Sequence, residues 1–492
     1  MSPSKNKPFS RRDFLKTSAL GGLSAAFGLG ATKVFAVPAG PEILDGSVRP
    51  AAGGLLTTEV PARQGKSVLD LRFDPMPKVR VAICGLNRGL THLESCLDIE
   101  NVQIVAVNDL RQDRVQRAVS LCEKSGHKKP DTYVGPEEYK KIVARDDIDV
   151  LYIATPWEWH IPMAIEAMKN GKHAAVEVLA AVSLKQCWEL VDASEKYQRY
   201  CLQLENCNFG ESEMAVMNMI DQGVFGTVVH AECAYVHNLL HLLHDKDGEG
   251  AWRRAYHYKY NGNLYPTHGL GPVAWYMNIH RGNKFNHIVS MSSPEAGLSE
   301  FRARPEFAAQ LNHLGYSTAD EQYICGDVNT SLIKTASGQS IMVQHDIITP
   351  RPYSRINSVN GTRACYADYP PRLATFDAMH SWEFLRTHDE GYGAGTFKAE
   401  FEAKHSHPMW KSMGKKAKTS GGHGGMDYMM NWYLMQNFLK GRPQPFTVYD
   451  AAAWSSVLEL SAISVAHNSA PVEFPDFTRG AWNKRSKLNL DF

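Results

Sequence analysis

The sequence predicts a two-domain fold: an α/β domain with a doubly wound parallel sheet, followed by an α+β domain with an open sheet. From residue 78 to residue 205, short β-branched apolar runs alternate with stretches of helical periodicity, which is typical of a parallel sheet covered by helices. After Asn206 the alternation stops, and longer loops separate amphipathic strands, as in a mixed or antiparallel sheet. The chain of 492 residues is long enough for two such domains.

The elements follow from these patterns. Apolar runs in the first half predict strands at residues 78–84, 102–109, 149–154 and 173–176. Helical spacing predicts helices at residues 90–97, 114–122, 136–144 and 160–170. In the second half we predict strands at 228–235, 330–334 and 340–346, a loop at 404–425 and a helix at 426–439. We therefore place the domains at residues 78–205 and 206–492, with the C-terminal segment free to pack back on the first domain. Residues 37–77, rich in Pro, Gly and Ala, form an N-terminal arm.

The composition argues against several kinds of partner. A formal net charge of +1 gives no electrostatic reason to expect nucleic acid or an anionic membrane as a partner. The nine cysteines are scattered without a CxxC pair. We therefore expect them to be small buried apolar side chains rather than a disulfide framework or a metal site.

The N-terminal residues have the pattern of an export signal. Arg11 and Arg12 precede a mildly apolar stretch at residues 17–29, and Val34-Phe35-Ala36 offers a cleavage site of the small-residue type. We expect residues 1–36 to be removed during export through the twin-arginine translocase, which leaves a periplasmic or secreted protein. The alternative is a retained anchor. The stretch is short for that role, since a membrane span needs about 20 apolar residues.

A dinucleotide site is predicted between the first two strands. Gly85 and Gly89 bracket a tight turn, GLNRG, at the start of a helix, where backbone N–H groups bind a pyrophosphate. The middle glycine of the usual GxGxxG pattern is missing. Asp109 ends the next strand, where a carboxylate binds the adenosine ribose hydroxyls and repels a 2′-phosphate. We therefore predict NAD as the cofactor, while the nearby Arg111 leaves NADP open.

A strand–loop–helix–strand signature runs through TPWEWH at residues 155–160, Ala164, GKH at residues 171–173 and Glu177. It resembles the glucose-fructose oxidoreductase and inositol dehydrogenase superfamily, which joins a Rossmann domain to an open-sheet domain. Dehydrogenases of that superfamily usually have Glu-Lys-Pro after the fourth strand, and the lysine helps proton transfer to or from the substrate alcohol. Here Val178 takes the place of the lysine, so an ordinary sugar dehydrogenase is less expected.

Longer motifs extend over nearly the whole mature chain. They are WEWH (157–160), EV (177–178), LENCN (204–208), HAEC (230–233), NGNLYPTHGLGP (261–272), QHD (344–346), PRPYSR (350–355) and GHGGMD (422–427). Together they are similar to glycoside hydrolase family 109, the NAD-dependent α-N-acetylgalactosaminidases. Two departures are the shortened glycine turn and Leu179, where the family tends to have proline.

The resemblance implies two sets of site residues, and a terminal N-acetylhexosamine of a glycan or glycoside as the substrate. The cofactor contacts would be Asn87, Arg88, Asp109, Trp157, Glu158, Trp159, His160, Glu177, Val178 and Asn206. The sugar contacts would be Tyr235, Arg253, Tyr265, Pro266, Thr267, His268 and Tyr353. Trp157 and Trp159 suit stacking on the nicotinamide or a sugar ring, with packing between the domains as the alternative. His423 suits either the site or a plain loop position.

The chemistry that the resemblance implies needs no pair of carboxylates, unlike that of most glycosidases. The sugar is oxidised at C3 by NAD, a base removes the acidified C2 proton and the C1 substituent is eliminated. Water then adds and the hydride returns. We expect Tyr235 and His268 to transfer protons, Tyr265 and Tyr353 to orient the sugar, and Arg253 to hold an acetamido or hydroxyl oxygen.

Two other functions stay open. One is an exported NAD(P)-dependent sugar oxidoreductase, with net oxidation of its substrate. The other is a non-catalytic sugar-binding protein that keeps NAD as a structural element. The preferred anomer, the C4 configuration of the sugar, the natural glycan and assembly into a homo-oligomer also stay open.

Overall fold

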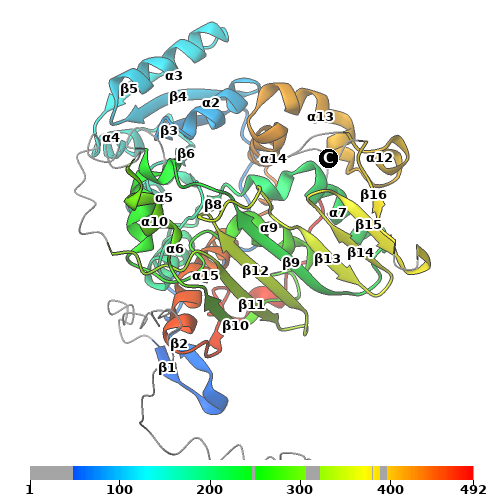
Figure 1. The fold of residues 1–492 in the computed structure, drawn as a ribbon. Coiled ribbons are helices and arrows are strands. Elements are labelled where there is room, and N and C mark those ends of the chain that lie inside the picture. Colours follow the sequence, from blue (N-terminus) through cyan, green and yellow to red (C-terminus); the bar gives the residue numbers. More distant parts are fainter. Residues whose placement is uncertain (1–47, 246–249, 306–321, 379–380, 388–395, 491–492) are drawn as a thin grey trace, which may run out of the picture. The chain divides into compact units, whose positions relative to one another are not determined.

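The computed structural model describes residues 48–245, 250–305, 322–378, 381–387 and 396–490. These residues form two β-sheets with helices packed on them (Figure 1). The predicted signal peptide at residues 1–36 lies outside the described residues. No helix in the described part of the chain is long and apolar enough to cross a membrane.

The first sheet has six parallel strands in the order β5-β4-β3-β6-β7-β8. They are β3 (Val79–Cys84), β4 (Val102–Asp109), β5 (Asp131–Val134), β6 (Val150–Ile153), β7 (His173–Val176) and β8 (Cys201–Gln203). The connecting helices are α2 (Gly89–Leu97), α3 (Gln112–Lys124), α4 (Tyr139–Val143), α5 (Trp157–Lys169) and α6 (Leu184–Tyr197). The strand order reverses between β3 and β6, and a ligand site is expected beyond the carboxyl ends of these two strands.

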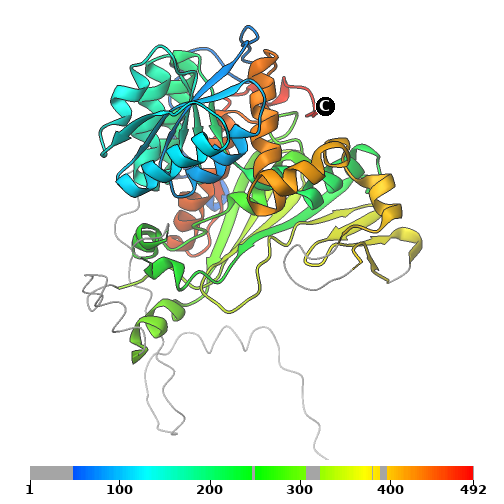
Figure 2. The same cartoon turned by 90° about the horizontal axis from the view of Figure 1, so that it is seen from above.

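Burial explains why these apolar runs form strands of a parallel sheet. Every residue of β6 and β7 is buried, as expected where helices cover both faces. Helices α2 and α3 pack together, and α4, α5 and α6 pack in series, so that helices flank the sheet (Figure 2). The prediction of a doubly wound α/β domain is confirmed.

The second sheet has eleven strands in mixed directions, in the order β1-β2-β17-β10-β11-β12-β9-β13-β14-β15-β16. Its longer strands are β9 (Val228–Val236), β10 (Phe285–Ser292), β11 (Asn329–Thr335) and β12 (Ser340–Asp346). The shorter ones beyond β9 are β13 (Ser358–Gly361), β14 (Ala364–Ala367), β15 (Arg372–Thr375) and β16 (Glu383–Phe384). Alternate residues of β11 are buried, because only one face of this sheet is covered. The predicted open-sheet α+β architecture is therefore also confirmed.

The helices that precede β11 in this second half include α7 (Glu211–Asp221), α8 (Ala251–Arg254), α9 (Thr267–Tyr276) and α10 (Gly297–Ala303). Helix α9 packs on β9. The N-terminal arm also contributes to this sheet, since β1 (Val48–Pro50) and β2 (Leu56–Thr58) join it through β17 (Val472–Glu473). We predicted no strand in the arm, because three-residue strands are too short to show an alternating pattern.

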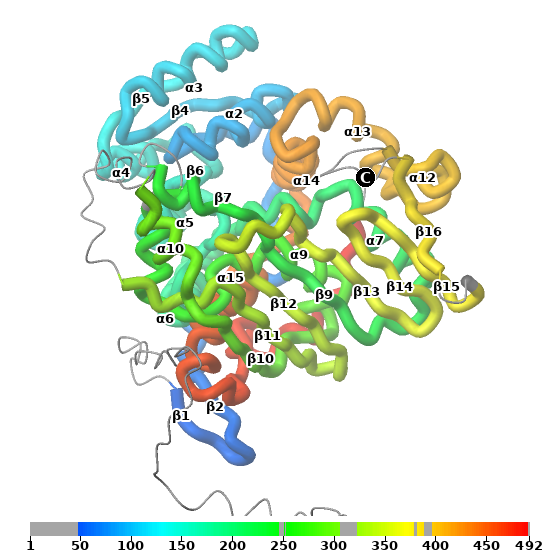
Figure 3. The backbone as a smooth tube through the Cα atoms, in the orientation of Figure 1, coloured from blue at the N-terminus to red at the C-terminus, as the bar shows by residue number. Residues whose placement is uncertain are grey.

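The C-terminal helices connect the two sheets. Helix α14 (Met426–Leu439), predicted at the same residues, packs against α2 (Figure 3). Helix α15 (Val448–Ala466) packs on α6 and β8 of the first sheet and on β10 of the second. The chain before α14 is thereby brought to the start of α2.

Two predicted elements need correction. Residues 404–425 were predicted as a loop, but α12 (Ala399–His405) extends into them and α13 (Pro408–Ser420) lies within them. The His407 side chain caps α13 by accepting a hydrogen bond from the Met409 N–H, and a proline suits the first helical turn. The buried Met409 and Trp410 then anchor the helix. Helix α4 is shorter than predicted, since it covers Tyr139–Val143 rather than 136–144.

Candidate active site

The turn between β3 and α2 is shaped for a dinucleotide. Gly85 has a left-handed backbone (φ 87°), and a Cβ there would collide with the carbonyl oxygen of Ala154. A Cβ on Gly89 would lie 3.0 Å from the side chain of Ile83. These are the roles of the first and last glycines of a dinucleotide fingerprint, a tight turn and close packing of helix on strand. The exposed Asn87 lies between them.

Asp109 supports this turn from the end of β4. Its Oδ2 accepts a hydrogen bond from the backbone N–H of Leu86 (2.6 Å), and its Oδ1 accepts one from the N–H of Arg111 (2.9 Å). Arg114 Nη1 lies 3.9 Å from Oδ2. Each carboxylate oxygen keeps acceptor capacity for a ribose hydroxyl. The residue therefore fixes the turn and is also suited to its predicted role.

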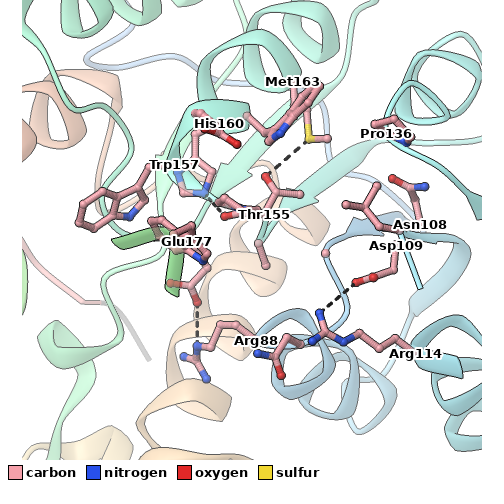
Figure 4. Close-up of a pocket in the computed structure, with 18 of the residues that line it drawn as sticks. Arg88, Asn108, Asp109, Arg114, Pro136, Thr155, Trp157, His160, Met163 and Glu177 are labelled. Atoms are coloured by element: carbon pink, nitrogen blue, oxygen red, sulfur yellow. Dashed lines mark hydrogen bonds and ion pairs between the residues drawn. The ribbon is translucent and has the colours of Figure 1, made fainter. Parts of the chain in front are cut away.

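A cavity of about 330 Å³ lies along this edge of the sheet (Figure 4). Nine of the ten predicted cofactor residues line it, namely Asn87, Arg88, Asp109, Trp157, Glu158, Trp159, His160, Glu177 and Val178. Asn206 does not line it. A helix N-terminus for the pyrophosphate and a carboxylate at the end of the second strand are the features that NAD requires, so the residues present fit this cofactor.

Trp157 and His160 hold the loop that follows β7. Trp157 Nε1 donates to the carbonyl oxygen of Val178 (3.0 Å). The His160 ring nitrogens lie 2.7 Å from the carbonyl oxygen of Leu179 and 2.8 Å from that of Thr155. Burial lowers the pKa of His160, and the contacts with the two carbonyl oxygens oppose this effect. Both side chains therefore shape the cavity wall through backbone contacts.

The two tryptophans of the WEWH motif have different surroundings. Trp157 packs against Trp252 and Tyr256, with ring centroids 5.0 Å and 4.8 Å apart. Trp159 is half-buried against the main hydrophobic core. Both indoles thus have packing partners, and both also line the cavity.

A buried ion pair lies directly after β7. Glu177 Oε1 lies 2.9 Å from Arg88 Nε (Figure 4). The same oxygen lies 2.7 Å from His92 Nε2. Burial would raise the pKa of Glu177, but Arg88 and His92 outweigh it and lower the pKa, so the carboxylate is ionised. The ionised carboxylate holds Arg88 at the cavity wall.

Five of the predicted sugar residues come together beside the cavity. The Tyr265 ring lies 4.5 Å from that of Tyr235 and 5.0 Å from that of His268, centroid to centroid. The Tyr353 ring lies 6.2 Å from that of Tyr235. Arg253 lines the cavity, and its guanidinium lies 5.2 Å from the Tyr265 ring. Arg253 therefore connects the aromatic cluster with the cofactor site.

His268 lies in a hydrogen-bonded chain. Its Nδ1 is 2.7 Å from Glu205 Oε1 and its Nε2 is 3.4 Å from the Tyr265 hydroxyl. The Glu205 side chain is fully buried, and Oε1 also accepts the Cys207 N–H (3.2 Å). A carboxylate in this position holds the proton on Nδ1 and leaves Nε2 for chemistry. The ligand atoms of Glu205, Cys207 and His268 also lie within 4.8 Å of one another. The 2.7 Å contact between His268 Nδ1 and Glu205 Oε1 is nevertheless a hydrogen bond. Two atoms that bind the same zinc ion at about 2.0–2.3 Å lie farther than 2.7 Å from each other.

Two hydroxyl groups of this cluster have side-chain partners, and two further predicted sugar residues lie beside it. The Tyr235 hydroxyl lies 3.1 Å from His237 Nδ1, and the Tyr353 hydroxyl accepts a hydrogen bond from Arg355 Nη1 (3.0 Å). Pro266 and Thr267 are buried at the start of α9. Pro266 and Thr267 therefore contribute by shaping the backbone that carries His268.

The side chains in or beside the site that were not predicted include Glu205, His237 and Asp427. Glu205 and Asp427 lie inside the motifs LENCN and GHGGMD, so the signal was present in the sequence. Their partners His268 and Arg88 are 63 and 339 residues away along the chain, and only the fold brings them together.

Two family models match consecutive parts of the chain, the first over the parallel sheet and the second over most of the mixed sheet. The model described as "Oxidoreductase family, NAD-binding Rossmann fold" matches residues 79–204, and "Glycosyl hydrolase 109, C-terminal domain" matches residues 209–484. A Glycosyl hydrolase family 109 protein from Shewanella baltica is 44% identical over 436 residues, which cover 87% of this chain and 91% of the relative. The chain belongs to glycosyl hydrolase family 109. A family 109 protein from Shewanella pealeana is 42% identical over 459 residues, which cover 89% of this chain and 96% of its own.

Solved structures with the fold of this family 109 protein include sugar dehydrogenases. Levoglucosan dehydrogenase in complex with NADH and levoglucosan has a TM-score of 0.58 at 15% identity, covering 81% of this chain and 100% of its own. The myo-inositol 2-dehydrogenase from Lactobacillus plantarum has a TM-score of 0.54 at 15% identity, covering 81% and 99%. At this identity the likeness establishes the fold. The family 109 chain is thus a glycosidase-family protein on an oxidoreductase fold, and NAD is its cofactor.

Proposed function

We propose that this family 109 protein releases a terminal N-acetylgalactosamine from a glycan or glycoside without net oxidation or reduction. The observation that carries the proposal is the chain of Tyr265, His268 and Glu205 beside the cofactor cavity. Most glycosidases place two carboxylates about 5–10 Å apart around the glycosidic bond. Here Glu205 is buried behind His268, which supports acid–base work by the histidine instead.

When bound, NAD would take a hydride from the sugar C3 and return it at the end of the turnover. The task of the protein is to move protons at the C3 hydroxyl, at C2 and at the leaving oxygen. His268 Nε2 is one proton carrier, because Glu205 stabilises the ring when it is protonated. Tyr235 is the other, and its hydroxyl is hydrogen-bonded to His237 Nδ1, which can take up its proton.

The other site residues bind and orient the sugar. Burial raises the pKa of Tyr265 well above its usual value of 10.0, although Arg253 opposes this effect. The Tyr265 phenol therefore stays protonated and donates a hydrogen bond. Arg253 is suited to an acetamido oxygen, since its guanidinium has five N–H donors, and Tyr353 adds a hydroxyl next to Tyr235.

A coupled assay tests the proposal. The NAD-loaded protein is incubated with an aryl N-acetyl-α-galactosaminide while phenol release and NADH absorbance are followed. We expect many turnovers of phenol release without accumulation of NADH. NADH that accumulates without phenol would identify a sugar oxidoreductase, and sugar binding with neither product would identify a non-catalytic binding protein.

Two variants serve as controls for this assay. Tyr235→Phe and His268→Ala should abolish phenol release while the protein retains its NAD. In a non-catalytic binding protein, the same substitutions would leave sugar affinity nearly intact and would have no turnover to remove.

We also propose export of the folded protein through the twin-arginine translocase to the periplasm or the medium. Arg11 and Arg12 before the apolar segment support this route. A redox-neutral cycle would need only the one NAD carried inside the protein. In cell fractionation, the full-length chain with Arg11→Lys and Arg12→Lys should stay in the cytoplasm, and unchanged export of this variant would contradict the proposal.

A further inference from the structure

A left-handed turn before α14 points a buried carboxylate at the cofactor residues. His423, Gly424 and Gly425 have consecutive positive φ values of 53°, 67° and 100°. Such a run favours glycine, and it leads directly into the first turn of α14, which contains Asp427. A Cβ on Gly422 would lie 2.7 Å from Asp427 Oδ2. The GHGGMD motif is therefore built to bring Asp427 into this position.

Asp427 uses both of its oxygens on residues of the cofactor site. Oδ1 accepts hydrogen bonds from Arg88 Nη2 (2.8 Å) and Asn206 Nδ2 (2.7 Å). Oδ2 accepts from Arg88 Nη1 (3.1 Å) and lies 2.8 Å from His423 Nδ1. The side chain is fully buried. A bidentate arginine–carboxylate pair of this kind fixes the direction as well as the charge of the guanidinium.

Arg88 is thereby held between two carboxylates. Its Nε binds Glu177, which lines the cavity, and its two Nη atoms bind Asp427. Asn206, the one predicted cofactor residue that does not line the cavity, is held by the same carboxylate. Burial would raise the pKa of Asp427, but Arg88 and His423 outweigh it and keep the residue ionised.

We propose that Asp427 is a positioning residue for NAD, through which the C-terminal helix α14 sets the orientation of Arg88 and Asn206 and so controls how tightly the cofactor is held. The purely structural alternative is that Asp427 only attaches α14 to α2. The two differ in what the loss of the carboxylate changes. A positioning residue changes the affinity for NAD more than the stability of the cofactor-free protein. A structural ion pair changes that stability and leaves the affinity of the folded protein unchanged.

The test measures the Kd of NAD by calorimetry on the full chain stripped of its cofactor, together with urea unfolding of the cofactor-free form. Asp427→Asn should raise the Kd about 10- to 150-fold, since hydrogen bonds to charged groups contribute about 1.5–3 kcal/mol and each 1.4 kcal/mol is tenfold. Asp450→Asn is the matched control. Asp450 is a buried carboxylate in the first turn of α15, paired with His280 at 3.1 Å and outside the cavity lining. This control should lower stability and leave the Kd of NAD unchanged.

A second variant keeps the proposal testable if Asp427→Asn does not fold. His423 is half exposed and its ring bonds Asp427, so His423→Ala should fold and raise the Kd of NAD about 2- to 5-fold, as expected for the loss of one hydrogen bond. In an Arg88→Lys background, Asp427→Asn should add much less to the Kd than it does alone. An unchanged Kd in both Asp427→Asn and His423→Ala would overturn the proposal. An equal rise in Kd from Asp427→Asn in the wild-type and the Arg88→Lys backgrounds would also overturn it. No sugar is present in these measurements, so their outcome is independent of the proposed hydrolysis.

Discussion

The hydrogen bond between Glu205 and His268 should set the rate of hydrolysis. Glu205→Gln keeps the shape of the side chain and its acceptor for the Cys207 N–H, but it removes the charge that faces Nδ1 at 2.7 Å. A buried hydrogen bond to a charged group contributes about 1.5–3 kcal/mol. If that contribution is made mainly while the ring carries a second proton, kcat should fall about 10- to 150-fold. KM should change little, because Nε2 stays in place.

The assay is phenol release under NAD saturation, with bound NAD and urea unfolding measured on the same samples. Glu195→Gln is the matched control, since Glu195 is equally buried but pairs with Arg63 and Arg479 away from the cavity. It should lower stability and leave kcat unchanged. A Glu205→Gln protein that folds, holds NAD and turns over at the wild-type rate would refute the role assigned to this pair.

Three further outcomes are expected. Gly85→Ala should lower the free energy of unfolding, measured by urea titration, by about 2 kcal/mol or more. The added Cβ strains a left-handed residue and collides with Ala154. An unchanged free energy of unfolding would contradict this role of the turn. Asp109→Asn should weaken the binding of NAD about tenfold and narrow the preference for NAD over NADP. The carboxylate both holds the Leu86 N–H and repels a 2′-phosphate. Calorimetry with both cofactors checks this, and unchanged selectivity would count against it. His345→Leu should raise the free energy of unfolding by about 1–3 kcal/mol, since neither ring nitrogen finds a hydrogen bond in the part of the chain that the structure describes. Burial lowers the pKa of His345 from its usual 6.5 to about 3, so the unfolded chain binds the proton first. The wild type therefore loses stability as the pH falls from 6.5 toward 3. The His345→Leu variant should lose less stability. Equal losses of stability by the two proteins between pH 7 and pH 4.5 would contradict the buried, unprotonated state assigned to His345.

The first domain could be predicted from the sequence because its signals are local. The four central strands of the parallel sheet are largely apolar runs, and Asp109 ends one of them. The edge strands β5 and β8 were not predicted. The helix at residues 426–439 was also predicted, and most of its residues are buried. Helix α13 was not predicted, although its lysines and its first-turn proline both suit a helix. Its burial against the rest of the chain, through Trp410, adds to these local preferences.

The site was predictable in its parts but not in its connections. Tyr235, Tyr265 and His268 were predicted as residues, and the structure brings their rings together. The carboxylates that hold the site residues, Glu205 and Asp427, were not identified, although both lie inside motifs that had been singled out. Their roles depend on contacts between distant segments, and no spacing in the sequence encodes such contacts.

The central claim, hydrolysis through a transient oxidation at C3, is tested most directly by carrying out the reaction in D₂O. The released N-acetylgalactosamine is isolated and its deuterium content at C2 is measured by NMR. Removal of the C2 proton and its return from exchangeable groups predict deuterium at C2 in the product, with one phenol released per sugar and no net NADH. Complete hydrolysis with only hydrogen at C2 would contradict the mechanism, and with it the roles assigned to Tyr235 and His268.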